Sequence, residues 1–235
     1  MNRHEWNQHA GEFEDAICDV IADETNNQVS RFVKAARLPS KPVLVDLGCG
    51  LGSFVRKFGN RFREVIAVDF AAQIIARAKR RCAAQPGVTW LVADVAGAFK
   101  QVGARADLTV CMNVITSPSA AKRNALWSCL ARITKRRGYA LIVVPSLESN
   151  RMVEKRYQDL GKDHQLASKR NGLVQREDSW QKHFERGELL SILAQQGFDV
   201  KRLGRVSYSW SSEGLRSRRL DKTLPWDWIC LAQRI

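Results

Sequence analysis

Three alternating glycines near residue 50 have the spacing of a turn that binds a ligand. They are Gly48, Gly50 and Gly52, and they follow an apolar run that contains Asp46. Glycine carries no side chain that would keep a ligand away from the backbone, and it readily adopts positive φ angles. A helix beginning within Ser53–Phe58 would turn its free N–H groups toward that ligand. The Gly-x-Gly-x-Gly spacing differs from the Gly-x-Gly-x-x-Gly of dinucleotide-binding folds, so we predict a different nucleotide-like cofactor.

Polar residues also follow three further strand-like apolar runs. Asp69 ends a run that starts near Arg63, Asp94 follows the run that starts at Trp90, and Asn113 follows the next one. An acid about 20 residues beyond the glycines is placed to accept hydrogen bonds from both hydroxyls of a ribose. Open α/β sheets bind ligands at the carboxyl ends of their strands, so we expect these polar residues to meet at one site.

With these four elements in this order, the sequence resembles the class I S-adenosylmethionine-dependent methyltransferases from about Val43 to Phe198. The resemblance implies S-adenosyl-L-methionine as the cofactor, with its methionine part on the glycine loop and its ribose on Asp69. It also implies that Asp94 accepts from the adenine amino group and that Asn113 lies near the methionine end and the incoming substrate. The cofactor-binding residues implied in this way are Asp46, Gly48, Gly50, Gly52, Asp69, Phe70, Asp94, Val95 and Asn113.

The alternation of strand-like and helical patterns predicts an α/β fold with a Rossmann-like, mostly parallel sheet and helices on both faces. Apolar residues recur at helical spacing within Glu12–Arg37, which predicts an N-terminal helical cap. Phe198–Leu203 has the pattern of a further strand, and Arg205–Trp210 with Asp227–Gln233 are expected to form a closing antiparallel pair. We predict one domain, composed of the cap (1–42), the cofactor-binding core (43–145), a lid or insertion (146–182) and the C-terminal helix with the closing strands (183–235).

The segment Ser146–Lys182 interrupts this alternation. It is rich in charge and in Gly, Ser and Asn, and it has few apolar residues at either period. Long segments at the ligand-binding edge of a rigid sheet commonly act as lids or substrate loops, so we place substrate specificity here. The alternative is a solvated surface excursion with its own short helix.

Methyl transfer from a sulfonium is an in-line displacement, so the protein mainly has to align the reacting atoms and exclude water. An acceptor with a phenol, a hydroxyl or a protonated amine also needs a base that removes its proton. We nominate His9 and His183 as the catalytic candidates, with Tyr157 and His164 as alternatives. His9 lies in the cap that the family places over its cofactor, and His183 precedes the last helical pattern.

The residue types that bind metals show no metal-site spacing. The six cysteines form no Cys-x-x-Cys pair and the four histidines lack the spacing of zinc ligands, so no metal is predicted. The cysteines are expected to be reduced core residues, and Cys49 in the glycine loop receives no redox or nucleophilic role. No apolar run is long enough to span a membrane, which predicts a cytoplasmic protein without a membrane partner.

The substrate hypotheses depend partly on motifs that the sequence lacks. The residues after Met112 contain no polar-Pro-Pro-aromatic element, and the chain has no Pro-Cys pair for a cytosine-C5 nucleophile. Our leading hypothesis is therefore O- or N-methylation of a small-molecule metabolite by direct in-line transfer. The net charge of +14 motivates an alternative, a methyltransferase or binding protein that acts on RNA or a protein through its basic surface. A third hypothesis is a catalytically silent member that binds the cofactor for structure.

Overall fold

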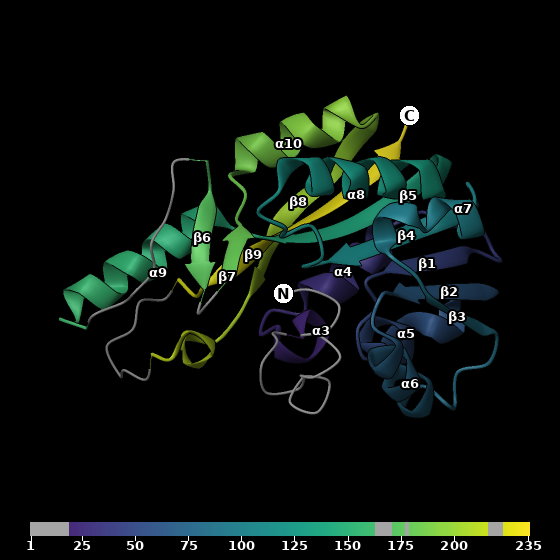
Figure 1. Ribbon diagram of the computed structural model, residues 1–235, viewed down its shortest axis with the longest axis horizontal. Coiled ribbons are helices and arrows are strands. Elements are labelled where there is room, and N and C mark those ends of the chain that lie inside the picture. The colour runs from purple at the N-terminus through teal and green to yellow at the C-terminus, as the bar shows by residue number, and fades with distance from the viewer. Residues whose placement is uncertain (1–18, 163–170, 177–178, 216–222) are drawn as a thin grey trace.

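A sheet covered by helices on both faces lies at the centre of the protein (Figure 1). The structure, a computed structural model, describes residues 19–162, 171–176, 179–215 and 223–235. The strands of the central sheet are β1 (Val43–Leu47), β2 (Glu64–Asp69), β3 (Val88–Val92), β4 (Ala106–Met112), β5 (Thr134–Pro145), β8 (Phe198–Ser207) and β9 (Trp226–Arg234). Their order is β3-β2-β1-β4-β5-β9-β8, with β1 to β5 parallel and β9 antiparallel to both of its neighbours. This confirms the predicted sheet and its closing antiparallel pair.

Helices cover the two faces of this sheet (Figure 1). The helices of the described residues are α3 (Val20–Asp23), α4 (Gln28–Ala35), α5 (Ser53–Phe58), α6 (Ala72–Arg81), α7 (Phe99–Val102), α8 (Ala120–Ile133), α9 (Leu147–Asp159) and α10 (Arg186–Gln195), with the 3₁₀ helices η2 (Gly59–Arg61), η3 (Val95–Gly97) and η4 (Trp210–Glu213). One buried cluster joins the sheet to α7, α8 and α10, and includes Trp127 and Leu193. A second cluster on the opposite face joins it to α4, α5 and α6, and includes Phe32 and Phe54. Because both faces are covered, β1 and β2 lack the polar alternation of a half-exposed strand.

The described part of the cap is helical, as its apolar spacing predicts. α3 and α4 lie within Glu12–Arg37, and α4 contacts β8 and β9. A Cβ added to Gly204 of β8 would lie 3.0 Å from Phe32 Cζ, so α4 packs closely on this strand. The candidate His9 lies outside the described residues. Among the residues that are described, no helix has the length and apolar character needed to cross a membrane.

β8 is a single strand, whereas the sequence suggested a break after Leu203. Its pairing with β9 continues across Gly204, which lies opposite Ile229. This glycine makes room for the close approach of α4 and does not form a turn. The prediction of a strand that extends to Trp210 was wrong, because β8 ends at Ser207 and Trp210 begins η4.

The segment 146–182 contains α9 and a hairpin of two antiparallel strands, β6 (Leu173–Arg176) and β7 (Ser179–Lys182). Val153 of α9 is buried in a small cluster with Trp210. Ser149 Oγ accepts a hydrogen bond from the backbone N–H of Trp226 at 2.8 Å. α9 is therefore packed against the closing part of the fold, although few apolar residues reveal this in the sequence.

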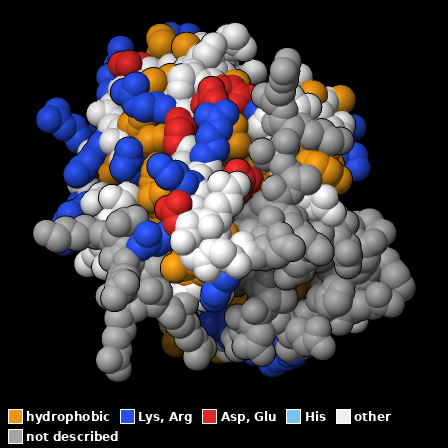
Figure 2. All heavy atoms as spheres, turned by 90° about the vertical axis from the view of Figure 1, so that its left-hand side faces the viewer, with side chains coloured by type: hydrophobic (Ala, Val, Ile, Leu, Met, Phe, Trp, Pro, Cys, Tyr) orange, Lys and Arg blue, Asp and Glu red, His pale blue; other side chains and the backbone are white. Residues whose placement is uncertain are grey.

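Charged side chains on the face shown in Figure 2 are mixed in sign. Lys and Arg groups are interspersed there with Asp, Glu and hydrophobic groups. Surface ion pairs among the described residues include Arg151 with Glu185 at 2.8 Å and Lys201 with Asp199 at 2.5 Å. Among the described residues on this face, the Lys and Arg groups do not gather into one basic patch.

Candidate functional site

A cleft of about 660 Å³ opens at the carboxyl ends of β1, β2 and β4. Its walls come from the glycine loop after β1, the turn after β2, the loop after β4, the start of α3, and β7. The volume lies in the range of pockets that hold small molecules and cofactors. The cleft is located where open α/β sheets bind ligands, as the strand-end residues predict.

The glycine loop forms one wall of the cleft, and its backbone requires glycine. Gly48 has a φ of +72° and Gly50 a φ of +51°, both in the left-handed region. The backbone N–H groups of Gly48 and Cys49 donate to the carbonyl oxygen of Val68 at 2.8 and 3.0 Å, which ties the loop to β2. A Cβ on Gly48 would lie only 2.2 Å from Val114 Cγ2, so the loop after β4 packs directly on this glycine.

We expect Gly48→Ala to lower the free energy of unfolding by about 1 to 3 kcal/mol, because alanine is strained at positive φ and its Cβ would displace Val114. Denaturant titration measures this change. The matched control is Gly187→Ala in α10, where no heavy atom lies within 4 Å of an added Cβ. Alanine should leave stability unchanged there or raise it by up to about 1 kcal/mol. Equal losses at the two positions would contradict the special role of Gly48.

Gly52 does not line the cleft, and it lies where the glycine loop packs against other elements. It caps α5 with a φ of +77°. A Cβ at this position would lie 2.8 Å from Cys82 Sγ and 3.1 Å from the ring of Trp90. The third glycine of the motif is therefore explained by close packing of the loop against the end of α6 and β3.

Asp69 ends β2, and backbone hydrogen bonds hold its carboxylate at the cleft. Gly50 N donates to Oδ2 at 3.1 Å, and Ala71 N donates to Oδ1 at 3.0 Å. Asp69 is only 8% exposed. Burial raises its pKa, an effect that the backbone donors of Ala71, Gly50 and Phe70 oppose. Each carboxylate oxygen can accept a further hydrogen bond, so two ligand hydroxyls can bind here.

Asp46 lines the cleft from the neighbouring strand β1 and is 4% exposed. Burial, and then the charges of Asp69 and Asp19, raise its pKa from 3.8 to about 7. Its Oδ2 is buried and has no hydrogen-bond partner among the described residues. Burial and the Asp46 charge also raise the pKa of the Cys49 thiol well above its usual value. That thiol stays protonated at neutral pH, in agreement with the expectation that it is no nucleophile.

The residues after β3 reach the cleft only in part. Val95 is buried and lines the cleft, as does Phe70 after β2. Asp94 is exposed, and its Oδ1 caps η3 by accepting a hydrogen bond from Ala96 N at 2.9 Å. Asp94 does not line the cleft. The adenine contact that the resemblance implies for Asp94 stays a prediction.

Asn113 lines the cleft and contacts two residues to which the sequence reasoning assigned no role. Its φ is +53°, a conformation that asparagine tolerates better than most residues. Its Nδ2 donates to Asp227 Oδ2 at 2.9 Å, and Tyr208 Oη donates to the same oxygen at 2.9 Å. An antiparallel strand begins at the edge where parallel strands end, so the predicted closing strand Asp227–Gln233 implies the edge at which Asp227 lies, but not its contact with Asn113.

Asp19 connects the described part of the cap to the glycine loop, and it was also missed. One of its oxygens caps α3 by accepting from Ile21 N at 3.0 Å and Ala22 N at 3.3 Å. The other accepts a hydrogen bond from Ser53 Oγ. Asp19 lines the cleft together with Val20 and Ile21, so the cap contributes a carboxylate and two apolar side chains to it.

The two catalytic candidates that the structure describes, His183 and Tyr157, do not line the cleft. His183 is 4% exposed and does not line the cleft. Tyr157 also lies outside the lining, and its hydroxyl donates to the carbonyl oxygen of Glu213. His9 and His164 lie outside the described residues. A role for His183 as a base stays a prediction that its position does not favour.

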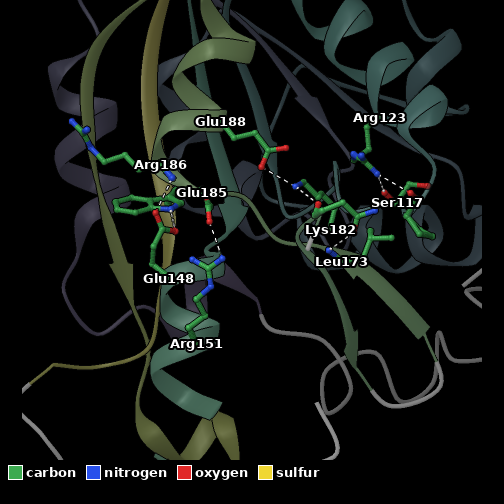
Figure 3. A network of polar contacts seen from close by, with 12 residues as sticks. Ser117, Arg123, Glu148, Arg151, Leu173, Lys182, Glu185, Arg186 and Glu188 are labelled. Atoms are coloured by element: carbon green, nitrogen blue, oxygen red, sulfur yellow. Dashed lines mark hydrogen bonds and ion pairs between the residues drawn. The ribbon is translucent and has the colours of Figure 1, made fainter. Parts of the chain in front are cut away.

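β7 brings the segment 146–182 to the cleft. Residues 179–181 of this strand line the cleft. The backbone N–H of Lys182 donates to the carbonyl oxygen of Thr116 at 2.8 Å, which joins the hairpin to the loop after β4. The buried Lys182 Nζ also donates to Glu188 Oε2 of α10 at 2.8 Å (Figure 3). The hairpin is therefore held on two sides beside the cleft.

Comparison with known proteins agrees with this geometry. The sequence profile of a family described as "Methyltransferase domain" matches residues 44–138. No curated protein matches the chain by sequence. The matched region runs from β1 into β5 and includes the glycine loop, Asp69 and Asn113.

Solved structures with a similar fold cover nearly the whole chain. Magnesium protoporphyrin IX methyltransferase from Synechocystis, crystallised with bound S-adenosylhomocysteine (SAH), has a TM-score of 0.63 at 17% identity over 99% of this chain and 97% of that one. A 1,6-didemethyltoxoflavin-N1-methyltransferase from Burkholderia thailandensis, crystallised with 1,6-didemethyltoxoflavin and SAH, has a TM-score of 0.68 at 16% identity over 99% of this chain and 86% of that one. An S-adenosylmethionine-dependent methyltransferase from Clostridium acetobutylicum has a TM-score of 0.65 at 13% identity over 97% and 98% of the two chains.

At these identities the likeness to solved structures establishes the fold, and the profile match concerns residues 44–138. Both agree with the strand order and with the position of the cleft. The chain therefore has the class I, Rossmann-like methyltransferase fold, and its residues 44–138 match the sequence profile of a methyltransferase domain.

Proposed function

We propose that this protein is an S-adenosylmethionine-dependent methyltransferase that methylates an oxygen or nitrogen of a small molecule by direct in-line transfer. The observation that carries the proposal is the carboxylate of Asp69, fixed by two backbone donors beside the positive-φ glycine loop. A carboxylate in this position can accept hydrogen bonds from both hydroxyls of a ribose. The similar structures that contain SAH support the same cofactor class here.

The residues of the cleft suit the binding and alignment that methyl transfer requires. When bound, S-adenosylmethionine supplies a methyl group activated by its sulfonium. Asp69 would hold the ribose, and the glycine loop would let the backbone approach the amino-acid part. Phe70 and Val95 would supply apolar surface to the cleft wall. Fixed alignment of the reacting atoms and exclusion of water account for much of the rate of such a displacement.

The small-molecule assignment is supported by the size and lining of the cleft. A volume of about 660 Å³ suits a cofactor and a compact acceptor. The loop after β4 and the hairpin add hydroxyl, amide and indole groups to its wall, from Thr116, Ser117, Trp180 and Gln181. Such groups orient a polar or planar molecule. One of the similar structures also holds a small-molecule ligand, 1,6-didemethyltoxoflavin.

Two measurements test the proposal. Calorimetry with S-adenosylmethionine and SAH measures cofactor binding, and labelled S-adenosylmethionine incubated with a cell extract shows where the methyl group goes. We expect both ligands to bind and the label to appear in the small-molecule fraction. A purified, folded chain that binds neither ligand would overturn the proposal. Label in the RNA or protein fraction would favour the macromolecular alternative, and RNA binding should then weaken steeply with salt.

Trp180→Ala is expected to lower kcat/KM for the acceptor about 2- to 10-fold, because an aromatic contact beyond simple burial contributes about 0.5 to 1.5 kcal/mol. Affinity for SAH should change by less than about twofold, since the residues that resemble cofactor contacts lie elsewhere in the cleft. Steady-state kinetics and calorimetry separate the two effects. Leu173→Ala is the matched control, because it lies on the same hairpin outside the cleft lining. An equal loss in both variants would show that the hairpin matters only for folding.

A further inference from the structure

A carboxylate beside the cleft receives hydrogen bonds from two other elements. Asp227 Oδ2 accepts from Asn113 Nδ2 and from Tyr208 Oη, in both cases at 2.9 Å. Asp227 lies near the start of β9, Tyr208 directly after β8, and Asn113 directly after β4. Asn113 lines the cleft, whereas Asp227 and Tyr208 do not. Asp227 can therefore influence a bound ligand through Asn113.

The contact with Asp227 decides which way the carboxamide of Asn113 faces. An ionised carboxylate accepts hydrogen bonds and donates none, so only the NH₂ end of Asn113 can face it. Turning the carboxamide by 180° would set its oxygen against a carboxylate oxygen. The carboxamide oxygen Oδ1 is therefore directed away from Asp227 and is available as an acceptor.

Two acceptor atoms at this edge of the sheet are buried and have no hydrogen-bond partner among the described residues. They are Asn113 Oδ1 and Asp46 Oδ2. Asp46 lies on β1, the direct neighbour of β4, and both residues line the cleft. A buried acceptor without a donor costs about 1 to 3 kcal/mol. Two such acceptors, one on β1 and one directly after the neighbouring β4, indicate a ligand group with several donors.

We propose that Asp227, supported by Tyr208, is a positioning residue that orients Asn113 so that its carboxamide oxygen accepts a hydrogen bond from the ammonium group of the cofactor's amino-acid part. This inference rests on the proposed function. An ammonium group has three N–H donors and no acceptor, which suits a cleft where Asn113 Oδ1 and Asp46 Oδ2 both lack a donor. The cleft lining contains three carboxylates and one lysine, Lys122, so its charges also favour a cation over a neutral group.

Asn113→Gly tests the ligand end of this arrangement. Glycine accepts the φ of +53° without strain, so the variant removes the carboxamide while preserving the backbone. The probes are SAH, which carries the ammonium group, and 5′-methylthioadenosine, which lacks the amino-acid part. We expect calorimetry to show that affinity for SAH falls about 5- to 20-fold. Affinity for 5′-methylthioadenosine should change by less than about twofold.

Asp227→Asn tests the positioning role. The new carboxamide can face Asn113 with its oxygen or with its NH₂ group, so it no longer excludes the turned orientation of Asn113. We expect an SAH affinity between those of the wild-type chain and of Asn113→Gly, and again little change for 5′-methylthioadenosine. The double variant should lose no more than Asn113→Gly alone, because Asp227 acts through Asn113. Asp199→Asn, at an exposed carboxylate on β8 that pairs with Lys201, is the matched control and should leave both affinities unchanged.

The outcomes separate this inference from the proposed function. A wild-type chain that binds neither SAH nor S-adenosylmethionine contradicts the proposed function itself. Equal losses for SAH and 5′-methylthioadenosine, additive losses in the double variant, or unchanged SAH affinity in Asn113→Gly would each overturn the inference alone. If Asp227→Asn fails to fold, the selective loss in Asn113→Gly still decides whether the carboxamide oxygen binds the ammonium group.

Discussion

Replacing Asp69 with alanine should weaken binding of S-adenosylmethionine about 10- to 100-fold while the chain stays folded. The carboxylate is the acceptor proposed for two ribose hydroxyls, and hydrogen bonds to charged groups contribute about 1.5 to 3 kcal/mol. Without it, the hydroxyls would enter a buried site that lacks a charged acceptor. Calorimetry with S-adenosylmethionine and SAH measures the loss.

Asp69 also accepts hydrogen bonds from Gly50 N and Ala71 N, so its removal acts on the loop as well as on the ligand. Asp69→Asn keeps the volume and one acceptor oxygen, and it should lose less affinity than Asp69→Ala. Asp199→Ala, at an exposed carboxylate near the start of β8, controls for the change of charge. Circular dichroism and thermal unfolding show whether each variant is folded. Unchanged affinity in a folded Asp69→Ala variant would remove the basis for the ribose assignment.

Cofactor affinity should rise by up to about tenfold per pH unit between about pH 5 and 7. Above about pH 7 it should level off. Burial and neighbouring carboxylates raise the pKa of Asp46 to about 7, so the unliganded protein holds a proton there in mildly acidic solution. A cationic ligand favours the ionised form, so binding releases that proton. Asp69, whose pKa is also raised, adds an effect of the same sign.

The Asp46 contribution to the stability of the unliganded fold changes with pH in the opposite direction to cofactor affinity. In the unfolded chain its carboxyl ionises near 3.8, whereas in the folded chain it keeps its proton until about pH 7. The folded state thus binds more protons in this window, so the Asp46 contribution to the free energy of unfolding falls as the pH rises from about 4 to 7. Ligand binding should restore stability at pH 7 and above.

Asp46→Asn provides the control, because its side chain stays neutral throughout this range. Calorimetry at pH 5, 6, 7 and 8, in two buffers that differ in ionisation enthalpy, measures both the affinity and the number of protons released. The variant should show a shallower pH dependence and release fewer protons than the wild-type chain. Equal slopes in the two proteins would show that Asp46 does not titrate on binding.

Local sequence patterns were sufficient to predict the strands and the helix whose ends line the proposed cofactor site. An apolar run followed by an acid or an amide predicted β1, β2 and β4 together with their terminal residues, and Ser53–Phe58 forms α5 as its position after the glycines indicates. Parallel strands buried on both faces need continuous apolar runs, and their carboxyl ends share one edge, so pattern alone places these side chains together. Seven of the nine predicted cofactor residues line the cleft: Asp46, Gly48, Gly50, Asp69, Phe70, Val95 and Asn113.

The tertiary structure alone decided contacts between residues far apart in the chain. Asp227 meets Asn113 across 114 residues because β9 inserts antiparallel between β5 and β8, and no local pattern specifies that order. The tertiary structure also decided the surroundings of Gly52, which makes room for Cys82 and Trp90. It likewise decided the position of His183, which is buried away from the cleft lining. Residue type and spacing determine which segments form strands and helices, because those preferences act over a few residues. Which side chains share a cavity depends on the packing of whole elements, and only the folded chain specifies that packing.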